Sequence, residues 1–237
     1  MSFSLRTGLA LAAASAFCLT VAGCGGGQGD PLASMSAKQV LTKAVSDLKS
    51  ASAFRVSGRV NEDGGLSLLL TYKHGTGCGG TLGIGSRGSL SLLVIGDVAW
   101  MKPDDKFWKT YAGSSASRVI ALMGGRYLKG PAHSGRLSGL TRVCDVNSLA
   151  SSLASPNDIA KGPVTTVNGQ QALVLKDKSK SATMYVTDTS SPQILQVIST
   201  RPGNGNSGKA YFTGYGKPVT LTPPPASQTI NGAPFGF

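Results

Sequence analysis

Acidic and aromatic residues are scarce in this chain of 237 residues. Only 11 residues are Asp or Glu, Glu62 is the single glutamate, and aromatic residues make up 6% of the sequence. A coiled coil would be rich in glutamate, so that class is excluded. No apolar run long enough to cross a bilayer several times follows residue 24, which excludes a multi-span membrane protein.

Glycine, basic and aliphatic residues are abundant instead. The chain has 32 glycines, 41% hydrophobic residues and 23 Lys or Arg residues, with a formal net charge of +12. A disordered chain would not contain so much Leu, Val and Ile. The length allows one domain of moderate size or two small ones.

The first 24 residues have the pattern of a bacterial lipoprotein signal peptide. Arg6 precedes an apolar stretch at 9–21, and residues 21–24 (Val-Ala-Gly-Cys) resemble a lipobox, in which the cysteine thiol is diacylglycerated and the chain is cut before it. The sequence therefore predicts a signal peptide at 1–23 and a lipid anchor on Cys24. The alternatives are an ordinary secreted protein with a chance cysteine and an uncleaved membrane anchor, although the stretch is short for a span.

These features predict the location and outline of the mature protein. A diacylglycerol brings two acyl chains, which hold a protein stably on a membrane surface. We therefore expect the mature chain on the outer face of the cytoplasmic membrane, attached through its N-terminal diacylglycerol. The glycine-rich residues 24–35 are predicted to form a flexible tether, and residues 36–237 a single domain.

Two cysteines, Cys78 and Cys144, remain once the signal peptide has left and Cys24 carries lipid. Outside the cytoplasm, a disulfide between them is the simplest expectation. Two free thiols and a metal site that includes His74 and His133 are the alternatives. Structural zinc sites place their ligands in closely spaced pairs, which this sequence lacks.

One amphipathic helix is predicted before a long series of strands. Ser36 and Gln39 form a capping-box pattern, and apolar residues then recur at helical spacing over 37–50. From Phe54 onward, apolar residues alternate with polar ones, which is typical of half-buried strands. Asn168-Gly169 between two such runs predicts a tight hairpin.

The complete pattern predicts ten or eleven antiparallel strands with a helical insertion in the middle. Because no helix follows each strand, a parallel doubly wound fold is excluded. The predicted fold class is α+β, with a large curved antiparallel sheet covered by a few helices. Strands are predicted at 54–60, 66–73, 81–86, 89–95, 98–102, 163–167, 171–176, 182–187, 193–200 and 210–215, with an edge strand at 219–222, and insertion helices at 114–123 and 145–153.

Several predicted strands are apolar on one face and small or polar on the other, as in 66–72 and 90–94. An apolar sheet face must be covered by helices, by a partner or by a ligand. The few short helices predicted here leave part of that face for a partner or a ligand.

Six segments resemble those of a known family. They occur in order along nearly all of the mature chain. They are the lipobox at 21–24, Ser-Ala-Ser-Ala-Phe-Arg-Val-Ser-Gly at 50–58, Val-Ala-Trp-Met-Lys at 98–102, Val-Thr-Thr-Val-Asn-Gly-Gln at 164–170, Met-Tyr-Val-Thr at 184–187 and Tyr-Phe-Thr-Gly-Tyr-Gly-Lys-Pro-Val at 211–219. Together they resemble the LolA/LolB-like lipoprotein superfamily, in particular the actinobacterial LppX/LprG-type lipoproteins. The glycine-rich segment 75–88 departs from the better-known carriers of this group.

The resemblance implies a half-barrel of antiparallel strands wrapped around helices that form a lid. Members of known function hold acyl chains of lipids or lipoglycans between sheet and helices and carry them toward the cell envelope. We therefore expect this chain to bind or carry acyl chains there. The alternative is a structural or interaction lipoprotein of the envelope whose sheet is filled by its own side chains. The residues expected to line an acyl site are Leu66, Leu68, Leu70, Tyr72, Leu90, Leu92, Val94, Trp100, Met101, Leu122, Met123 and Met184.

No sequence pattern indicates an enzyme. Two G-x-G-x-x-G matches, at 75–80 and 83–88, lie among predicted strands, whereas a dinucleotide site needs the motif between a strand and a helix. His133 and Ser134 are adjacent, but adjacency does not orient a base and a nucleophile. No pair of carboxylates is marked for acid–base work. We therefore predict no catalysis, no cofactor and no metal.

Basic residues are spread along the chain, with a tight cluster only at Lys176, Lys178 and Lys180. The interleaving of aromatic and basic residues that binds nucleic acid is missing, so we expect no nucleic-acid partner. Anionic headgroups at a membrane surface would attract such a basic body, and so would an anionic lipid or lipoglycan. A plain solvated surface is the alternative. We expect a monomer.

Overall fold

A computed structural model describes residues 31–61, 65–133, 138–154, 158–179, 181–200 and 207–235. The predicted signal peptide and Cys24 lie outside these residues. Within them, no helix combines the length and the apolar character that crossing a membrane would require.

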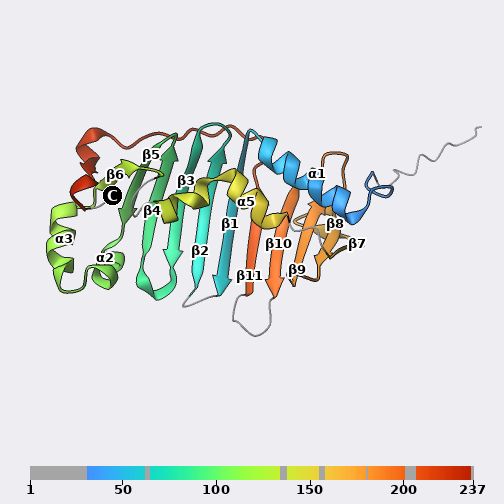
Figure 1. The fold of residues 1–237 in the computed structure, drawn as a ribbon, viewed down its shortest axis with the longest axis horizontal. Helices are drawn as coiled ribbons and strands as arrows, with labels where there is room; N and C mark the ends of the chain where they lie inside the picture. The colour runs from blue at the N-terminus through green and yellow to red at the C-terminus, as the bar shows by residue number, and fades with distance from the viewer. Residues whose placement is uncertain are drawn as a thin grey trace, which may run out of the picture.

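The strands form one sheet of twelve (Figure 1), in the order β12-β6-β5-β4-β3-β2-β1-β11-β10-β9-β8-β7. All neighbouring pairs are antiparallel except β12 and β6, which run parallel. The strands are β1 (Ala53–Asn61), β2 (Leu66–Lys73), β3 (Gly77–Ile84), β4 (Ser89–Ile95), β5 (Val98–Pro103), β6 (Tyr127–Pro131), β7 (Ile159–Val167), β8 (Gln170–Asp177), β9 (Ala182–Thr187), β10 (Ile194–Thr200), β11 (Ser207–Thr213) and β12 (Thr229–Asn231).

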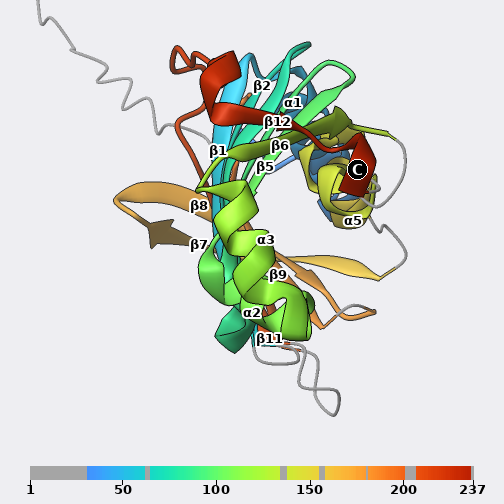
Figure 2. The same cartoon turned by 90° about the vertical axis from the view of Figure 1, so that its left-hand side faces the viewer.

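Helices α1 (Ala37–Ser50) and α5 (Val146–Leu153) lie on one face of this sheet, which is curved when seen from its end (Figure 2). We call the face that bears α1 and α5 the concave face, and the opposite one the convex face. The described helices are α1 (Ala37–Ser50), α2 (Asp105–Tyr111), α3 (Ala116–Met123), α4 (Ser138–Thr141) and α5 (Val146–Leu153). Helices α1 and α5 cross the upper ends of the strands, and α2 and α3 lie beside the lower end of β5 (Figure 1).

The N-terminal helix confirms the predicted capping box. The Ser36 hydroxyl accepts a hydrogen bond from the backbone N–H of Gln39 at 3.2 Å, and the Gln39 side chain accepts from the backbone N–H of Ser36 at 2.7 Å. Five apolar residues of α1 are buried, all on the side that faces the sheet: Val40, Leu41, Ala44, Val45 and Leu48.

Most predicted strands are present. Three of them begin several residues earlier than predicted, including β11 at Ser207 instead of 210, and four α-helices or strands have no predicted counterpart, including β12. Strand β3 begins at Gly77 instead of 81, and β7 begins at Ile159 instead of 163. The elements α2, α4 and β6 were not predicted. The predicted edge strand at 219–222 is wrong, because the sheet ends on β12 instead. Prolines at 218 and 223–225 flank that segment and remove ladder donors on both sides of it.

Glycines explain why β3 carries so few side chains. Gly77 and Gly80 have φ of 146° and 158°, and a Cβ on either would overlap the carbonyl oxygen of Val94 or of Leu69 on the neighbouring strands. The glycine-rich segment is therefore a strand held closely between β2 and β4.

The core lies between the concave face and the helices. Phe54 and Tyr72 stack with their ring centroids 4.6 Å apart, and Tyr215 packs on the other side of Phe54 at 5.9 Å. The hydroxyl of Tyr215 donates to the carbonyl of Ile194 at 2.8 Å, and that of Tyr72 donates to the carbonyl of Val143. Burial raises the pKa of both tyrosines, so each stays a neutral donor.

A disulfide joins Cys78 on β3 to Cys144 in the turn before α5, with their Cα atoms 5.2 Å apart. The predicted pairing of these two cysteines is therefore present. It closes a loop with a sequence separation of 66 residues and ties the α4–α5 segment to the concave face.

The last part of the predicted tether is packed. Leu32 is fully buried in the core, and the Lys161 ammonium on β7 donates to the carbonyl of Leu32 and to that of Ala33. Residues 31–35 thus belong to the folded body, because an apolar side chain follows the glycines closely enough to reach the core.

Candidate functional site

Ten of the twelve residues predicted to line an acyl site are brought together on the helix-bearing side. Seven come from β2 and β4, two from β5 and β9, and Met123 reaches the same core from α3. The strand register explains this, since Leu70 lies opposite Gly80, Gly80 opposite Leu92, and Leu92 opposite Met101. The ten are Leu66, Leu68, Leu70, Tyr72, Leu90, Leu92, Val94, Met101, Met123 and Met184.

Trp100 and Leu122 do not lie with the other ten. Trp100 pairs with Leu93 and therefore points to the convex face, where the Lys129 ammonium lies 5.9 Å from its ring centroid. Leu122 is 51% exposed on α3. Successive side chains of a strand point to opposite faces, so Trp100 and Met101 cannot both line one site. The register across the β4–β5 hairpin places Met101 on the concave face.

The upper half of the concave face is closed by the helices and filled by the chain itself. A cavity of about 50 Å³ remains between α1, α5 and strands β7 to β10. Ligand pockets usually measure roughly 300–1,000 Å³, so this cavity holds no acyl chain unless the helices move. It is lined by Leu41, Ser152, Leu153, Ile159, Leu175, Asp177, Ala182, Met184 and Val197.

The lower half of the concave face is apolar and partly exposed. We call it the open strip: Val60, Leu66, Leu68, Ile84, Ala210 and Val197, of which Val197 also lines the small cavity and marks the boundary with the closed half. Leu66 is 40% exposed and the other five are half-buried, whereas Leu70 and Tyr72, higher on β2, are buried under the helices.

Small residues run through the middle of the open strip. Gly58 lies opposite Leu68 on one side and Ala210 on the other, and Val60 lies opposite Gly208. With no long side chain at these positions, a ligand lying there could reach the sheet backbone between Leu68 and Val197.

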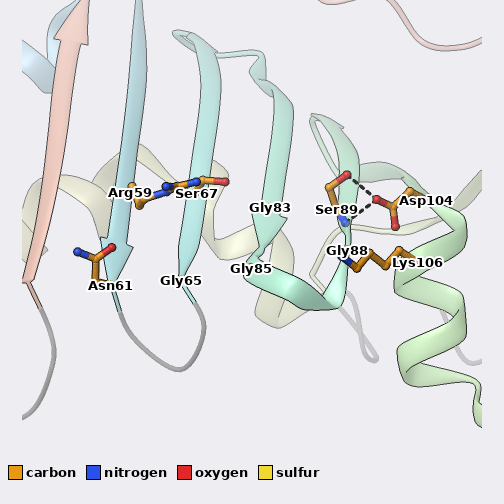
Figure 3. Close-up of a pocket in the computed structure, with 10 residues that line it drawn as sticks. All are labelled: Arg59, Asn61, Gly65, Ser67, Gly83, Gly85, Gly88, Ser89, Asp104 and Lys106. Carbon is orange, nitrogen blue, oxygen red and sulfur yellow. Dashed lines mark hydrogen bonds between the residues drawn. The ribbon is translucent and has the colours of Figure 1, made fainter.

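A second hollow, of about 700 Å³, lies on the convex face at the lower ends of β1 to β4 (Figure 3). Arg59, Asn61, Ser67 and Lys106 line it, together with four glycines, Ser89 and Asp104. It is open to solvent. Its one carboxylate, that of Asp104, lies beside the Ser89 hydroxyl and is engaged in capping α2.

Asp104 in this hollow holds the start of α2. Its carboxylate accepts hydrogen bonds from the backbone N–H of Phe107 at 2.7 Å and from the backbone N–H and hydroxyl of Ser89, each at 2.8 Å (Figure 3 shows the two from Ser89). Burial alone would raise the pKa of this carboxyl, but these hydrogen bonds and nearby Lys106 outweigh it, and the pKa is lowered. The residue acts as an N-cap and a strand–helix clamp.

A third hollow, of about 540 Å³, lies beside the disulfide. His133 lies there, with its Nε2 3.6 Å from Asp97. Asp145 caps α5, and hydrogen bonds from the Ser148 hydroxyl at 2.6 Å and from the N–H of Asn147 lower the pKa of its carboxyl, against the opposing effect of burial. Asp145 is therefore engaged in holding local structure, whereas the contact between Asp97 and His133 is exposed to solvent.

The sequence patterns that were considered for catalysis do not lie in the structural context that their chemistry requires. The first G-x-G-x-x-G match falls in the turn and start of β3, the second at its end and in the turn to β4, and neither opens a helix of a βαβ unit. Ser134 lies outside the described residues. Among the residues that are described, no three His, Cys, Asp or Glu side chains are grouped to hold a metal ion.

Some residues of the candidate sites were not predicted, because only the pairing of strands and the packing of helices bring them together. Leu41, Leu153 and Val197 line the small cavity from three elements. Arg59 and Lys209 are direct cross-strand partners between β1 and β11, although 150 positions of sequence separate them. Alternation predicts which face each residue takes, but not which strand lies beside it.

Comparisons with known proteins find the fold in mycobacterial lipoproteins. The crystal structure of LprF from Mycobacterium bovis matches 79% of this chain and 96% of its own, with a TM-score of 0.55 at 13% identity. Mycobacterium tuberculosis lipoprotein LppX matches 78% of this chain and 98% of its own, with a TM-score of 0.49 at 11% identity. Neither a protein-family model nor a curated protein matches the sequence. The likeness to LprF is one of fold, and it confirms the predicted α+β architecture.

Proposed function

We propose that this protein is an extracytoplasmic, lipid-anchored protein that binds the acyl chain of a lipid or lipoglycan against the concave face of its sheet. The observation that carries the proposal is the open strip, an apolar surface left partly exposed beside a closed core. Contiguous apolar surface on a monomer marks a site for a ligand or a partner.

The position of the strip favours an acyl chain over a bulky ligand. It runs across β3, β2, β1, β11 and β10, is lined by aliphatic residues, and has glycine and alanine at its centre. Each methylene removed from water there would contribute about 0.8 kcal/mol. The closed upper half would then act as a rigid wall, so loading would require no movement of α1 or α5.

The anchor pattern and the disulfide support the proposed location. Disulfides persist outside the cytoplasm, and Cys78–Cys144 is buried within the fold. The lipobox at 21–24 supports attachment through Cys24, and the tether would span the glycine-rich residues before the packed turn at 31–35.

Native mass spectrometry tests the proposal. A Cys24→Ser protein, exported in a bacterial host that makes related lipids, is compared in its native and denatured masses. We expect extra mass of lipid size that is released on denaturation. The Leu66→Asp variant should lose it, because a carboxylate would lie against the acyl chain.

The matched control is Leu69→Asp, on the same strand but on the opposite face. Leu69 is 57% exposed and lies opposite Thr81 and Ser57, outside the open strip. It should retain the bound lipid. Equal loss in both variants, or no lipid on the unsubstituted protein even after incubation with phospholipid, would overturn the acyl-binding proposal.

The second candidate is a lipoprotein of the envelope that carries no lipid and binds another protein. The cavity of about 50 Å³ favours it, because the chain's own side chains fill the space between helices and sheet. Under this function the open strip would be covered by the partner. A bare polypeptide mass together with a partner crosslinked at position 66 would establish it.

A further inference from the structure

The convex face has a charge distribution that the acyl site does not explain. On β1, β2 and β11 its outward residues include Arg55, Arg59, Leu69, Lys73, Lys209 and Tyr211, which we call the docking face. Asp177 is the single acidic residue within the described strands, and it lies on the concave side, where it lines the small cavity. The docking face is therefore basic without compensation from its own strands.

Two cations on this face stand directly opposite one another. Arg59 on β1 pairs in register with Lys209 on β11, and both side chains are exposed. Like charges at directly opposed positions of an antiparallel pair destabilise the sheet. In the part of the chain that the structure describes, neither lies within ion-pair distance of a carboxylate. Such an arrangement is stabilised when an external anion lies between the two cations.

Aromatic rings accompany the lysines of the convex face. The ammonium of Lys209 lies 5.8 Å from the ring centroid of Tyr211, and that of Lys102 lies 5.0 Å from Tyr127. Lys129 lies 5.9 Å from the ring centroid of Trp100, but that ring is buried and is not available to a membrane surface. A tyrosine side chain has an apolar ring and a polar hydroxyl at its tip. Beside long basic side chains, it is suited to the boundary between lipid headgroups and acyl chains.

An exposed leucine completes the pattern. Leu69 is 57% exposed in the middle of the docking face, one strand from Arg55 and Arg59. A soluble polyanion would gain from the cations only, whereas a bilayer surface would also take up the leucine and the tyrosine ring.

We infer that the docking face rests on a bilayer surface rich in anionic phospholipid, with lipid phosphates between Arg59 and Lys209. The concave face and its acyl site then point away from that bilayer. This inference rests on the convex face alone and holds whether or not the concave face binds lipid.

Vesicle co-sedimentation tests the inference. The Cys24→Ser protein is mixed with phosphatidylcholine vesicles with and without phosphatidylglycerol, and we expect binding only when the anionic lipid is present. The double variant Arg59→Gln/Lys209→Gln should lose roughly tenfold or more in affinity. Lys109→Gln/Arg118→Gln removes the same charge from exposed positions on α2 and α3 and should bind nearly as well as the unsubstituted protein.

Equal losses in the two double variants would show attraction by net charge alone and overturn the inference. Binding to dextran sulfate without binding to the anionic vesicles would overturn it in favour of a soluble polyanion. The Leu66→Asp variant should bind vesicles unchanged, which separates this face from the acyl site.

Fluorescence gives an independent measure of orientation. Leu69→Trp should show a blue-shifted difference spectrum on phosphatidylglycerol vesicles, because the new ring would enter the interface. Leu122→Trp, at a residue of similar exposure on α3, should show none. A shift confined to Leu122→Trp would place a different surface on the bilayer and overturn the inference.

Discussion

The two faces of this sheet are made by the same strands and differ in almost every physical property. On β2, Leu70 is buried under the helices while its neighbour Leu69 is 57% exposed on the convex side. On β1, Phe54 and Val56 enter the core while Arg55 and Arg59 face outward. The difference teaches that simple alternation can give one sheet an apolar face and a basic face.

The disulfide is the strongest link between the concave face and its cover. Replacing both cysteines, as Cys78→Ser/Cys144→Ser, should lower the free energy of unfolding by roughly 4 kcal/mol, because the denatured chain regains the freedom of a long loop. Urea denaturation of the oxidised protein and of the variant measures this. A loss close to zero would mean that the α4–α5 segment is held by packing alone.

Adjacent leucines on β2 compare the two faces directly. Leu70→Ala should lower the free energy of unfolding by about 3 kcal/mol, since it leaves a cavity in the core. Leu69→Ala should change it by about 0.5 kcal/mol or less. Thermal or urea unfolding of both variants measures the two losses in unfolding free energy. Similar losses at the two positions would contradict the assignment of faces.

Asp104 tests how the edge of the sheet is held, because it links the start of α2 to β4. Asp104→Asn should cost about 1 kcal/mol of unfolding free energy, because both carboxylate oxygens accept hydrogen bonds and the amide NH2 cannot accept those of the oxygen it replaces. Asp105→Asn, one residue on and exposed, is the matched control and should cost less. In urea denaturation, the Asp104→Asn variant should therefore unfold at a lower midpoint than the Asp105→Asn variant. The reverse order would contradict the role of Asp104.

Acid should loosen the helices that cover the concave face before the sheet itself. The folded pKa values of Asp104 and Asp145 are both lowered, so each carboxylate contributes stability above its ordinary pKa of about 3.9. That contribution is lost as the pH falls from about 4 through the folded values. Asp104→Asn/Asp145→Asn should flatten the pH dependence of stability in this window, and an unchanged slope would contradict the assigned roles.

Local patterns predicted the concave face better than they predicted its surroundings. Alternation and capping identify α1 and most of the strands, because these signals lie within a few residues of each other. Helix α2 and strand β6 were missed because both are short: α2 has seven residues after its Asp104 cap, and β6 has five residues and ends in Gly-Pro.

For the candidate site too, the features set by local patterns were predicted and those set by distant contacts were not. The predicted wall residues of β2 and β4 are together, but Trp100 is on the other side, since the register across the β4–β5 hairpin determines its face. That the upper half is closed and the lower half open depends on where α1 and α5 come to rest. No local pattern specifies that position.

The pairing of β1 with β11 has a consequence for how the chain reaches its native state. Val56 meets Phe212 across this pair, so the centre of the sheet closes only when the last long strand has been made. Each half, β1 to β6 and β7 to β11, is built from neighbouring hairpins and can form quickly by itself, whereas joining them requires contacts far apart in sequence and should be slow. Until that step, β1 and β11 are free edges that could pair with another chain. Arginines on β1 and the lysine on β11 would discourage such pairing, so the same charges that face outward in the finished sheet would protect the unfinished one from aggregation.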